Sequence, residues 1–369
     1  MKVAFDHQIF TQQMYGGISR YYTFLANELL KQDCEVRVLG GLHRNNYLGE
    51  LPPEIVKGVK LLAYPPKTGR IFQLINHGLS QIHMKFWKPD VIHETYYSSM
   101  PIIDTRIARI TTVYDMINEL FRDEIPNSAK TSALKKATFK RVDHIVSISE
   151  STKNDLVNLF GVPEDKISVV HLGVDLAKFQ IEHSDKQMNL KPYLLYVGSR
   201  AGYKNFFGFL EAFRSSSQLK SNFDVIAFGG GNFTKDEIQL INDFGLSETQ
   251  IHQYNGNDQV LAKLYANAEV FVYPSLYEGF GLPPLEAMAS GCPVVSSNTS
   301  SMPEVVRQAG EFFNPKDIDD MREAIERVVF SRQRQMDLVR LGYENIKYFS
   351  WEKCAEKTFR VYQKTTGLL

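Results

Sequence analysis

Short apolar runs alternate with amphipathic stretches along most of this chain, and this alternation limits the fold more than any other feature. The apolar runs suit buried strands, and the stretches between them show helical spacing, as at residues 18–31. Such a pattern is typical of parallel sheets flanked by helices. The strand candidates are residues 3–5, 35–39, 90–93, 110–114, 144–148, 167–170, 193–198, 223–229, 251–254, 269–274 and 292–296. The sequence therefore predicts an α/β fold built from doubly wound parallel sheets.

The length of the chain indicates two such domains. Its 369 residues exceed the size at which a single hydrophobic core normally divides. Residues 176–192 are polar and lack clear periodicity, so we place the linker there. We expect an N-terminal Rossmann-like domain over residues 1–180 and a C-terminal one over residues 190–350. Because ligands of such sheets bind at the carboxyl ends of the strands, two facing domains would form a cleft between them.

Composition excludes several classes of protein. The formal net charge is zero, so no basic field indicates a nucleic-acid partner. Cys34, Cys292 and Cys354 lie far apart and make neither a disulfide framework nor a zinc spacing, which favours a reducing compartment. No apolar signal region precedes the first strand, and no apolar run approaches the roughly 20 residues of a membrane helix. We expect a cytoplasmic protein, either soluble or peripheral on the cytoplasmic face of the membrane.

A glycine-rich loop that opens into a helix is the most informative motif. It runs Tyr-Glu-Gly-Phe-Gly-Leu-Pro-Pro-Leu-Glu over residues 277–286, after the strand candidate 269–274. Backbone N–H groups at residues 279–282 and the start of a helix can bind an anion such as a phosphate. Glu286 suits the paired hydroxyls of a ribose, and Glu278 suits a second polyol. The alternative is a simple turn in which Glu286 only complements the helix dipole.

A second loop carries two cations after the first strand of the C-terminal domain. It contains Ser199, Arg200 and Lys204 within the sequence Val-Gly-Ser-Arg-Ala-Gly-Tyr-Lys-Asn, residues 197–205. Arginine binds a diphosphate as a bidentate fork and lysine binds it as a point charge. A solvated turn explains the same charges, but this loop and the glycine-rich loop share one edge of the predicted sheet.

Glycines also mark a loop near the N-terminus. Gly16 and Gly17 lie between the first strand and a helix, where they permit a ligand to approach the backbone closely. A strand-to-helix turn accounts for them nearly as well.

The sequence from Glu278 through seven residues to Glu286, followed by Ala-Met-Ala-Ser-Gly-Cys-Pro-Val-Val, resembles the signature of family 4 retaining glycosyltransferases, which have the GT-B fold. The resemblance implies that Glu286 holds the nucleotide ribose and that Glu278 contacts the transferred sugar. It implies that the amides of Gly279, Phe280, Gly281 and Leu282 meet the donor diphosphate. It also implies that Arg200 and Lys204, beside Ser199, grip the pyrophosphate.

The resemblance extends to the first domain and the C-terminus. Gly16 and Gly17 match a Gly-Gly loop near the donor phosphate and the acceptor. Asp115 matches the second residue of a His-Asp pair, in which Tyr114 replaces the histidine. The resemblance therefore implies for Asp115 only a contact with the acceptor or the sugar. A capped turn is the structural alternative for Asp115. His93, at another strand end, is interpreted as a structural histidine. The last helix, residues 351–369, is expected to return to the first domain.

The function that the resemblance implies is retaining transfer of a hexose from a nucleotide sugar, without a metal or another cofactor. Mannose from GDP-mannose is our first choice of donor, and the acceptor is a saccharide or lipid-linked glycan in surface polysaccharide or lipopolysaccharide synthesis. Two alternatives stay open: a UDP-sugar-dependent transferase of the same fold, and a catalytically silent nucleotide-sugar-binding protein.

Two segments suggest contact with the inner membrane face. Residues 70–87 mix apolar and polar positions at helical spacing, and Lys135, Lys136, Lys140 and Arg141 form a basic cluster. Both could dock on an anionic membrane that carries a lipid-linked acceptor. The alternative is a helix whose apolar face is turned to the core, together with a solvated charged face.

Overall fold

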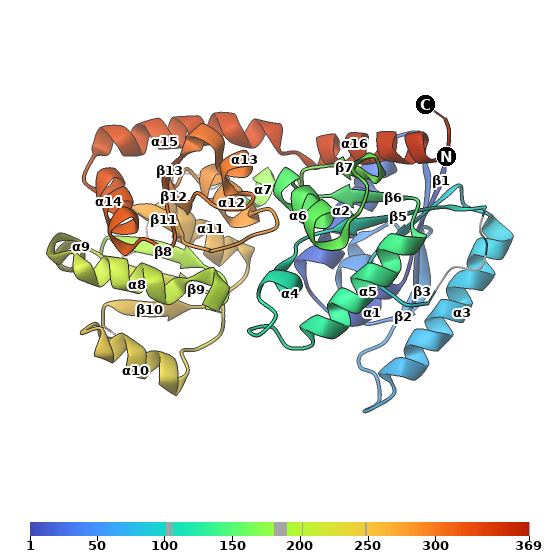
Figure 1. Cartoon of the computed structure of the whole chain (residues 1–369), viewed down its shortest axis with the longest axis horizontal. Helices are drawn as coiled ribbons and strands as arrows, with labels where there is room; N and C mark the ends of the chain where they lie inside the picture. The colour runs from blue at the N-terminus through green and yellow to red at the C-terminus, as the bar shows by residue number, and fades with distance from the viewer. Residues whose placement is uncertain (101–103, 105, 181–189, 201, 248, 369) are drawn as a thin grey trace. The chain divides into compact units, whose positions relative to one another are not determined.

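The computed structural model describes the whole chain except residues 101–103, 105, 181–189, 201, 248 and 369. It contains two compact units (Figure 1). Unit 1 comprises Met1–Gly173 and Trp351–Leu369, and unit 2 comprises Val174–Ser350. The division falls at the start of the expected linker, so α7 (Leu176–Phe179) belongs to unit 2; most of that linker lies outside the described residues.

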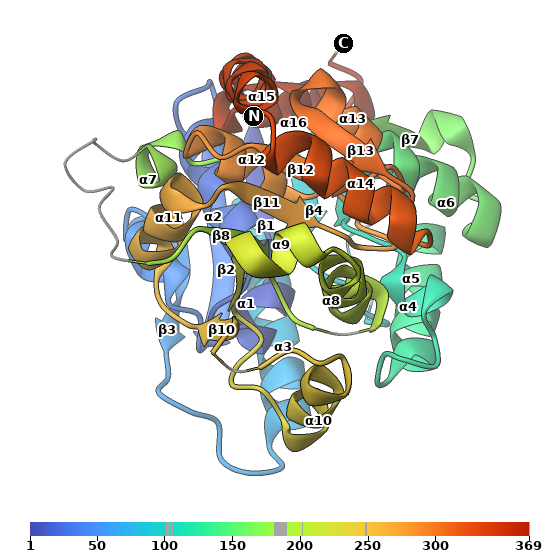
Figure 2. The same cartoon turned by 90° about the vertical axis from the view of Figure 1, so that its left-hand side faces the viewer.

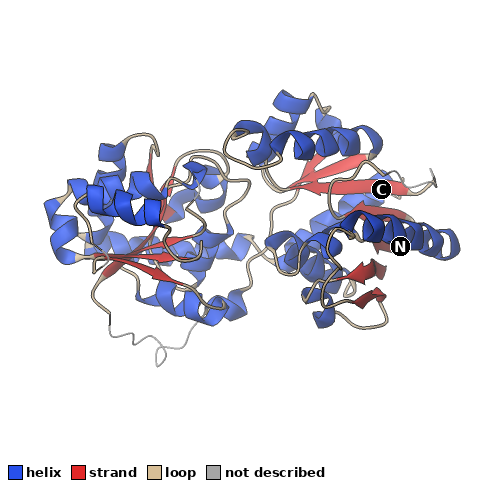
Figure 3. Cartoon of the chain, turned by 90° about the horizontal axis from the view of Figure 1, so that it is seen from below, coloured by secondary structure: helices blue, strands red, loops and turns tan. Residues whose placement is uncertain are grey.

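Unit 1 is built on a seven-stranded parallel sheet in the order β3-β2-β1-β4-β5-β6-β7. Its strands are β1 (Lys2–Phe5), β2 (Glu35–His43), β3 (Val56–Lys60), β4 (Val91–Glu94), β5 (Ala108–Val113), β6 (His144–Ser147) and β7 (Ile167–Val169). Helices lie against the sheet, as Figure 3 shows for both units. They are α1 (Gln8–Gln12), α2 (Gly17–Leu29), α3 (Gly69–Trp87), α4 (Ile117–Leu120), α5 (Ser128–Arg141), α6 (Glu150–Phe160) and α16 (Trp351–Thr365).

Unit 2 repeats the design with six parallel strands in the order β10-β9-β8-β11-β12-β13. Its strands are β8 (Tyr193–Val197), β9 (Asp224–Phe228), β10 (Ile251–Tyr254), β11 (Val270–Tyr273), β12 (Val294–Ser297) and β13 (Gly310–Phe313). The helices besides α7 are α8 (Phe206–Ser215), α9 (Ser217–Asn222), α10 (Lys235–Asp243), α11 (Asp258–Asn267), α12 (Leu282–Ala289), α13 (Met302–Val306), α14 (Ile318–Val329) and α15 (Arg332–Asn345). Figure 2 shows α12 beside β11 and β12, which it contacts.

The central strands explain why the apolar runs were readable from the sequence. Every residue of β8, β9, β11 and β12 is buried, because helices cover both faces of a parallel sheet. Helix α10 begins after its N-cap Thr234, where the side chains of Thr234 and Glu237 form a reciprocal capping box. All three cysteines are free thiols.

Helix α16 belongs to unit 1 although it is the last element of the chain. Trp351 stacks on Phe24 of α2 with ring centroids 4.7 Å apart. Near the other end of α16, Tyr362 is hydrogen bonded to His93 of β4 over 2.7 Å. The second ring nitrogen of His93 lies 2.8 Å from Thr112 Oγ1. The structural interpretation of His93 is therefore confirmed, and burial lowers its pKa to about 3, so the ring is neutral.

Strand order also identifies the ligand edge of each sheet. In unit 1 the chain leaves β1 toward β2 on one side and later adds β4 on the other; in unit 2 the same reversal occurs at β8, between β9 and β11. Ligands of open α/β sheets bind beside such reversals, at the carboxyl ends of the strands. The loops that follow β1, β5, β8 and β11 carry the residues singled out from the sequence.

Candidate functional site

The glycine-rich loop and the loop after β8 are joined directly in unit 2. Lys204 Nζ lies 2.6 Å from Glu278 Oε1, and both side chains are largely buried. The backbone supports this pair, because the N–H of Leu276 donates to the carbonyl oxygen of Tyr203 over 2.8 Å. The sequence prediction that these loops share one edge is confirmed. The ammonium neutralises Glu278 and so removes a charge that would otherwise repel an anionic ligand.

Three serines that sequence reasoning did not single out hold Glu278 in place. Ser275 Oγ donates to Glu278 Oε1 over 2.7 Å, and the N–H of Glu278 donates to Ser300 Oγ over 2.9 Å. Ser301 Oγ donates to the carbonyl oxygens of Glu278 and Phe280 over 2.9 and 2.8 Å. A usable signal existed: the run Ser-Ser-Asn-Thr-Ser-Ser, residues 296–301, begins in the last two residues of β12 and therefore lies at the same carboxyl edge.

Two buried tyrosines lie around the Glu278 carboxylate. The pKa of Tyr273 is raised well above its usual value, first by burial and then by the negative charge of Glu278. Burial and the same charge also raise the pKa of Tyr196. Lys204 Nζ lies 5.9 Å from the ring centroid of Tyr273, so the cation also interacts with an aromatic face. The Glu278 carboxylate and the Lys204 ammonium therefore lie in surroundings that hold little water, where charge interactions are stronger than in bulk solvent.

The start of α12 is shaped by Gly281. Its φ of 103° is a left-handed conformation, and a Cβ there would lie 2.4 Å from Met302 Cε. A larger residue at 281 would therefore strain the backbone and push the Met302 side chain aside. Because Pro283 and Pro284 have no N–H, the donors of this helix terminus come from Leu282 and from the glycine loop before it.

Glu286 lies on α12, one helical turn beyond Leu282. It is partly exposed and near the buried hydroxyl of Tyr265 on α11. The pKa of that tyrosine is raised well above its usual value by burial and then by the charge of Glu286. The expected role of Glu286 at a ribose stays a prediction.

Arg200 has partners that the sequence did not suggest. Its guanidinium donates to Glu237 Oε1 over 2.7 Å and to the carbonyl oxygens of Gly229, Gly231 and Asn232 over 3.0 to 3.2 Å. Only 3% of the side chain is exposed. In this arrangement Arg200 holds the turn after β9 against α10, and contact with a diphosphate would require these bonds to be exchanged. Ser199, before it, is exposed and accepts at its carbonyl oxygen a hydrogen bond from the Tyr196 hydroxyl.

The predicted residues of unit 1 lie at the carboxyl edge of its own sheet. Gly16 is the N-cap of α2, and a Cβ there would lie 2.3 Å from Gln13 Oε1. A side chain at 16 would therefore displace the Gln13 amide, whose oxygen accepts the N–H of Ser19. At Gly17 a Cβ would meet nothing within 4 Å, so packing does not explain that glycine.

Asp115 follows β5 and is joined to a network at the end of that strand. Its Oδ1 accepts the N–H of Ile117 over 3.0 Å, which is the capped turn weighed for it from the sequence. The carboxylate remains partly exposed and lies 3.9 Å from Lys135 Nζ. Tyr114, the residue before it, packs edge-on against Tyr21 of α2 with ring centroids 5.7 Å apart. The start of α2 and the end of β5 thus meet through these two tyrosines.

The four basic residues in the second half of α5, Lys135, Lys136, Lys140 and Arg141, do not form a basic patch on the surface. The Lys135 side chain is only 1% exposed, and its ammonium binds Glu119 and the carbonyl oxygen of Asp115, each over 2.8 Å. Arg141 is paired with the buried Glu94. Only Lys136 and Lys140 are exposed. Both sequence interpretations, membrane contact and a solvated face, fail for Lys135 and Arg141 because buried carboxylates neutralise their charges.

Metal ligands are not grouped in the described parts of the chain: no cluster of three His, Cys, Asp or Glu side chains there could hold an ion. The sequence Asp317-Ile318-Asp319 has the Asp-x-Asp spacing of some metal sites. Here Asp317 instead caps α14, accepting the N–H groups of Asp319 and Asp320 over 3.1 Å. No described helix is both long and apolar enough to span a bilayer.

Comparison with known proteins identifies the family of this chain. The family model described as "Glycosyltransferase Family 4" matches residues 15–178, and the model described as "Glycosyl transferases group 1" matches residues 179–345. The O-antigen chain mannosyltransferase B of Escherichia coli is 30% identical, over 94% of this chain and 96% of its own length.

Solved structures show the same fold at low sequence identity. Sucrose-phosphate synthase from Thermosynechococcus elongatus superposes with a TM-score of 0.77 over the full length of both chains, at 18% identity. Anabaena Alr3699/HepE, solved in complex with UDP and glucose, gives a TM-score of 0.72 over 99% of this chain and 100% of its own, at 14% identity. These similarities confirm the predicted fold of two Rossmann-like domains. With its two family matches and its full-length O-antigen relative, the chain belongs to glycosyltransferase family 4 and has the GT-B fold.

Proposed function

We propose that this glycosyltransferase moves mannose from GDP-mannose to a saccharide or lipid-linked glycan during synthesis of a surface polysaccharide. The choice of mannose is supported by the O-antigen mannosyltransferase, which aligns over nearly the whole chain. A UDP-sugar donor is the second candidate, because the structural neighbour Alr3699/HepE binds UDP and glucose.

The observation that carries this proposal is the Lys204–Glu278 ion pair at the entrance to the glycine loop. A buried carboxylate without its partner would repel a diphosphate. The pair has no net charge, and the Lys204 ammonium keeps N–H donors that can bind a diphosphate oxygen. The amides around Gly281 and Leu282 add further positive potential at the start of α12. These groups suit a leaving diphosphate, on which negative charge grows as the bond to the sugar breaks.

We propose a retaining reaction that needs no metal ion. The bond between the sugar C1 and the diphosphate oxygen breaks, and the electron pair stays on that oxygen. The acceptor hydroxyl forms its bond to C1 on the same face of the ring, and its proton passes to an oxygen of the departing diphosphate. Glu278 orients the sugar, and Lys204 stabilises the diphosphate. NMR assignment of the anomeric centre of the product tests retention, and unchanged turnover in EDTA tests metal independence.

The decisive measurement is release of nucleotide from candidate donors, with and without added acceptor. We expect turnover with GDP-mannose and a fall of about 10²–10³-fold in kcat for Lys204→Ala, the usual effect of losing one group that stabilises developing charge. Lys263→Ala, an exposed lysine of α11, is the matched control and should behave as the wild type.

Nucleotide affinity gives a separate readout of the ribose contact. Glu286→Ala should weaken GDP binding in calorimetry by about tenfold or more, as expected when a charged hydrogen bond is lost. The exposed Glu323→Ala of α14 serves as control. Tight nucleotide binding without turnover on any donor or acceptor would instead favour a silent sugar-nucleotide-binding protein, and normal turnover of Lys204→Ala would remove its role at the diphosphate.

A further inference from the structure

Helix α3 turns its large apolar side chains toward solvent. Ile71, Leu74, Ile75, Leu79, Ile82 and Phe86 are all exposed, Leu74 by 64% and Phe86 by 80%. Their spacing of three, one or four residues places them along one side of the helix. Val59 of β3 and Leu62 just after it are exposed as well. These eight residues are called the α3 face below. They make up nearly half of the exposed large apolar residues in the described part of the chain, which points to a contact surface.

The opposite side of α3 is held to the sheet by polar groups. Asn76 is fully buried, and its amide accepts the N–H of Leu42 over 2.7 Å and donates to the carbonyl oxygen of Leu42 over 3.1 Å. Ser80 is buried too and lies 3.1 Å from His7 Nδ1. Rotating the helix to bury its apolar side would break these bonds and leave buried polar groups unpaired. The outward direction of the α3 face is therefore fixed. The alternative of a core-facing helix holds only for Met84 and Trp87, which pack in a core cluster near the end of α3, and not for the exposed apolar residues.

The segment that carries this face contains charges of only one sign. Residues 56–88 contain Lys57, Lys60, Lys67, Arg70, Lys85 and Lys88 but no aspartate or glutamate, although the whole chain has no net charge. Five of the six cations are exposed, and Lys57 is partly exposed. Within the described residues none of them forms a salt bridge. Their charge is thus available to an anionic partner.

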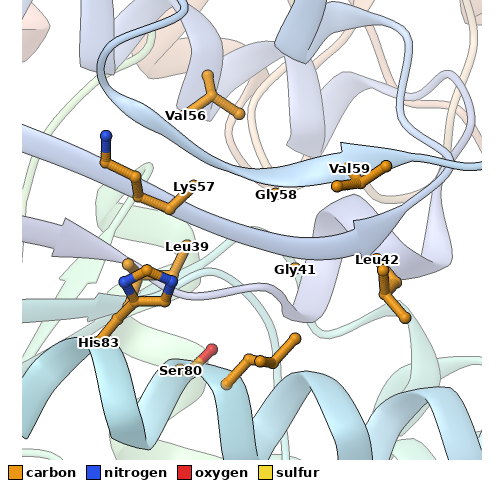
Figure 4. A pocket seen from close by; sticks show the side chains of 10 residues that line it. Leu39, Gly41, Leu42, Val56, Lys57, Gly58, Val59, Ser80 and His83 are labelled. Atoms are coloured by element: carbon orange, nitrogen blue, oxygen red, sulfur yellow. The ribbon is translucent and has the colours of Figure 1, made fainter.

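A groove adjoins the face where α3 passes the edge of the sheet. It has a volume of about 360 Å³ and lies between α3 and the strands β2 and β3 (Figure 4). Leu79 and Val59, two members of the α3 face, line it together with Leu39 and Val56. Figure 4 shows Lys57 and His83 near one end of this apolar lining. An apolar hollow beside a lysine suits a lipid chain whose head group carries negative charge.

We propose that the α3 face docks unit 1 on an anionic lipid bilayer, with the apolar side chains in the interfacial layer and the six cations over acidic head groups. Apolar burial and attraction to anionic lipids together are the two contributions that hold an amphipathic helix at a bilayer surface. A second copy of this chain fits less well, because a symmetric contact through this face would bring the same cations together. This inference rests on the proposed function, because docking would give the enzyme access to a lipid-linked acceptor.

The position of α3 links this surface to the ligand edge of unit 1. Ser80 and His77 of α3 line a small polar cavity with Asp6 and His7, which follow β1. The helix that would lie on lipid therefore also borders the carboxyl end of the sheet, where an acceptor is expected to bind. Docking would place this edge close to head groups that carry the acceptor glycan.

Co-sedimentation of the full chain with vesicles tests the proposal without any sugar donor. We expect binding to equimolar phosphatidylglycerol and phosphatidylcholine, at least about tenfold weaker binding to phosphatidylcholine alone, and weakening by salt. The triple variant Leu74→Ser/Ile82→Ser/Phe86→Ser should lose binding about tenfold or more. The pair Arg70→Gln/Lys85→Gln should lose most of the preference for phosphatidylglycerol.

The matched control replaces three exposed apolar residues elsewhere, Leu120→Ser/Leu159→Ser/Met336→Ser, and should bind vesicles as the wild type does. Equal binding by the α3 triple variant and the wild type would overturn the proposal. So would a wild-type dimer that the α3 variant dissociates while neither protein binds vesicles, because the face would then join two copies. Nucleotide release by the α3 variant without vesicles should be normal, so failure of docking and failure of the transferase assignment can be told apart.

Discussion

Ser300 supports the candidate site through a hydrogen bond to the backbone of Glu278. It has a φ of 51°, a conformation that glycine adopts more easily, and its hydroxyl accepts the N–H of Glu278. Ser300→Gly keeps the backbone and removes the hydroxyl, so relief of strain and loss of the hydrogen bond should nearly cancel in stability. We expect kcat to fall about tenfold, since Glu278 loses one of its supports, while the KM for the donor changes little.

Rescue distinguishes positioning from a general structural effect. Ser300→Asn supplies a side-chain oxygen and tolerates the same φ, so kcat should recover in part. If kcat of Ser300→Gly equals that of the wild type, the hydroxyl does not position Glu278. Steady-state kinetics and thermal unfolding of the two variants provide both measurements.

At the scale of single elements, the end of β1 makes stability depend on pH. Asp6 is buried, and its Oδ1 accepts bonds from the Thr95 N–H and hydroxyl over 2.8 and 2.6 Å. Burial, and then the charge of Glu94, raise the pKa of Asp6 to about 7. Between about pH 4 and 7 the folded state therefore binds more protons than the unfolded state, and the free energy of unfolding falls as pH rises.

Asp6→Asn keeps the accepting oxygen and removes this titration. Relative to the wild type, the variant should gain stability as pH rises from about 4 to 7, by roughly 3–4 kcal/mol from a shift of about three pKa units. Denaturant unfolding at several pH values measures this difference. The exposed Asp33→Asn should show no such trend, and a difference for Asp6→Asn that does not vary with pH would contradict the raised pKa.

Which elements the sequence predicted depended on their burial. All eleven predicted strands are present. In the central strands the apolar runs reflect cover on both faces, whereas the edge strands β7 and β10 were predicted although they are only partly buried. The edge strands β3 and β13 were missed: β3 reads Val-Lys-Gly-Val-Lys and is mostly exposed, and β13 begins with glycine. Charged residues on an edge strand prevent pairing with other chains, and in β3 they remove the apolar signal.

The same limit applies to the site. The loops that carry Glu278 and Lys204 could be assigned to one sheet edge from the order of strands alone. The partners of Arg200 could not be predicted in this way, because Glu237 and the turn after β9 meet Arg200 only through the packing of α10. The α3 face was also unreadable, since helical periodicity identifies an apolar side but not the direction in which it points.

At the scale of the whole molecule, the return of α16 to unit 1 could be predicted only from the family resemblance. Its tether, Tyr362 to His93, joins residues 269 positions apart, and no local pattern encodes such a contact. Each unit has its own sheet, and each carries separate parts of the candidate site. Nucleotide and sugar should therefore affect the two units differently.

Hydrogen exchange can detect this division of roles. GDP alone should protect the amides of residues 196–205 and 275–286 in unit 2, because both loops contribute to the diphosphate site, and should leave the Gly16–Gly17 loop of unit 1 unchanged. At about 100 times its Kd, the nucleotide should stabilise the state that binds it by about 2.7 kcal/mol. The Lys204→Ala variant should show weaker protection at the same concentration. Protection by GDP confined to unit 1, or none in residues 275–286, would mean that the nucleotide binds elsewhere and that the Lys204–Glu278 pair serves stability alone.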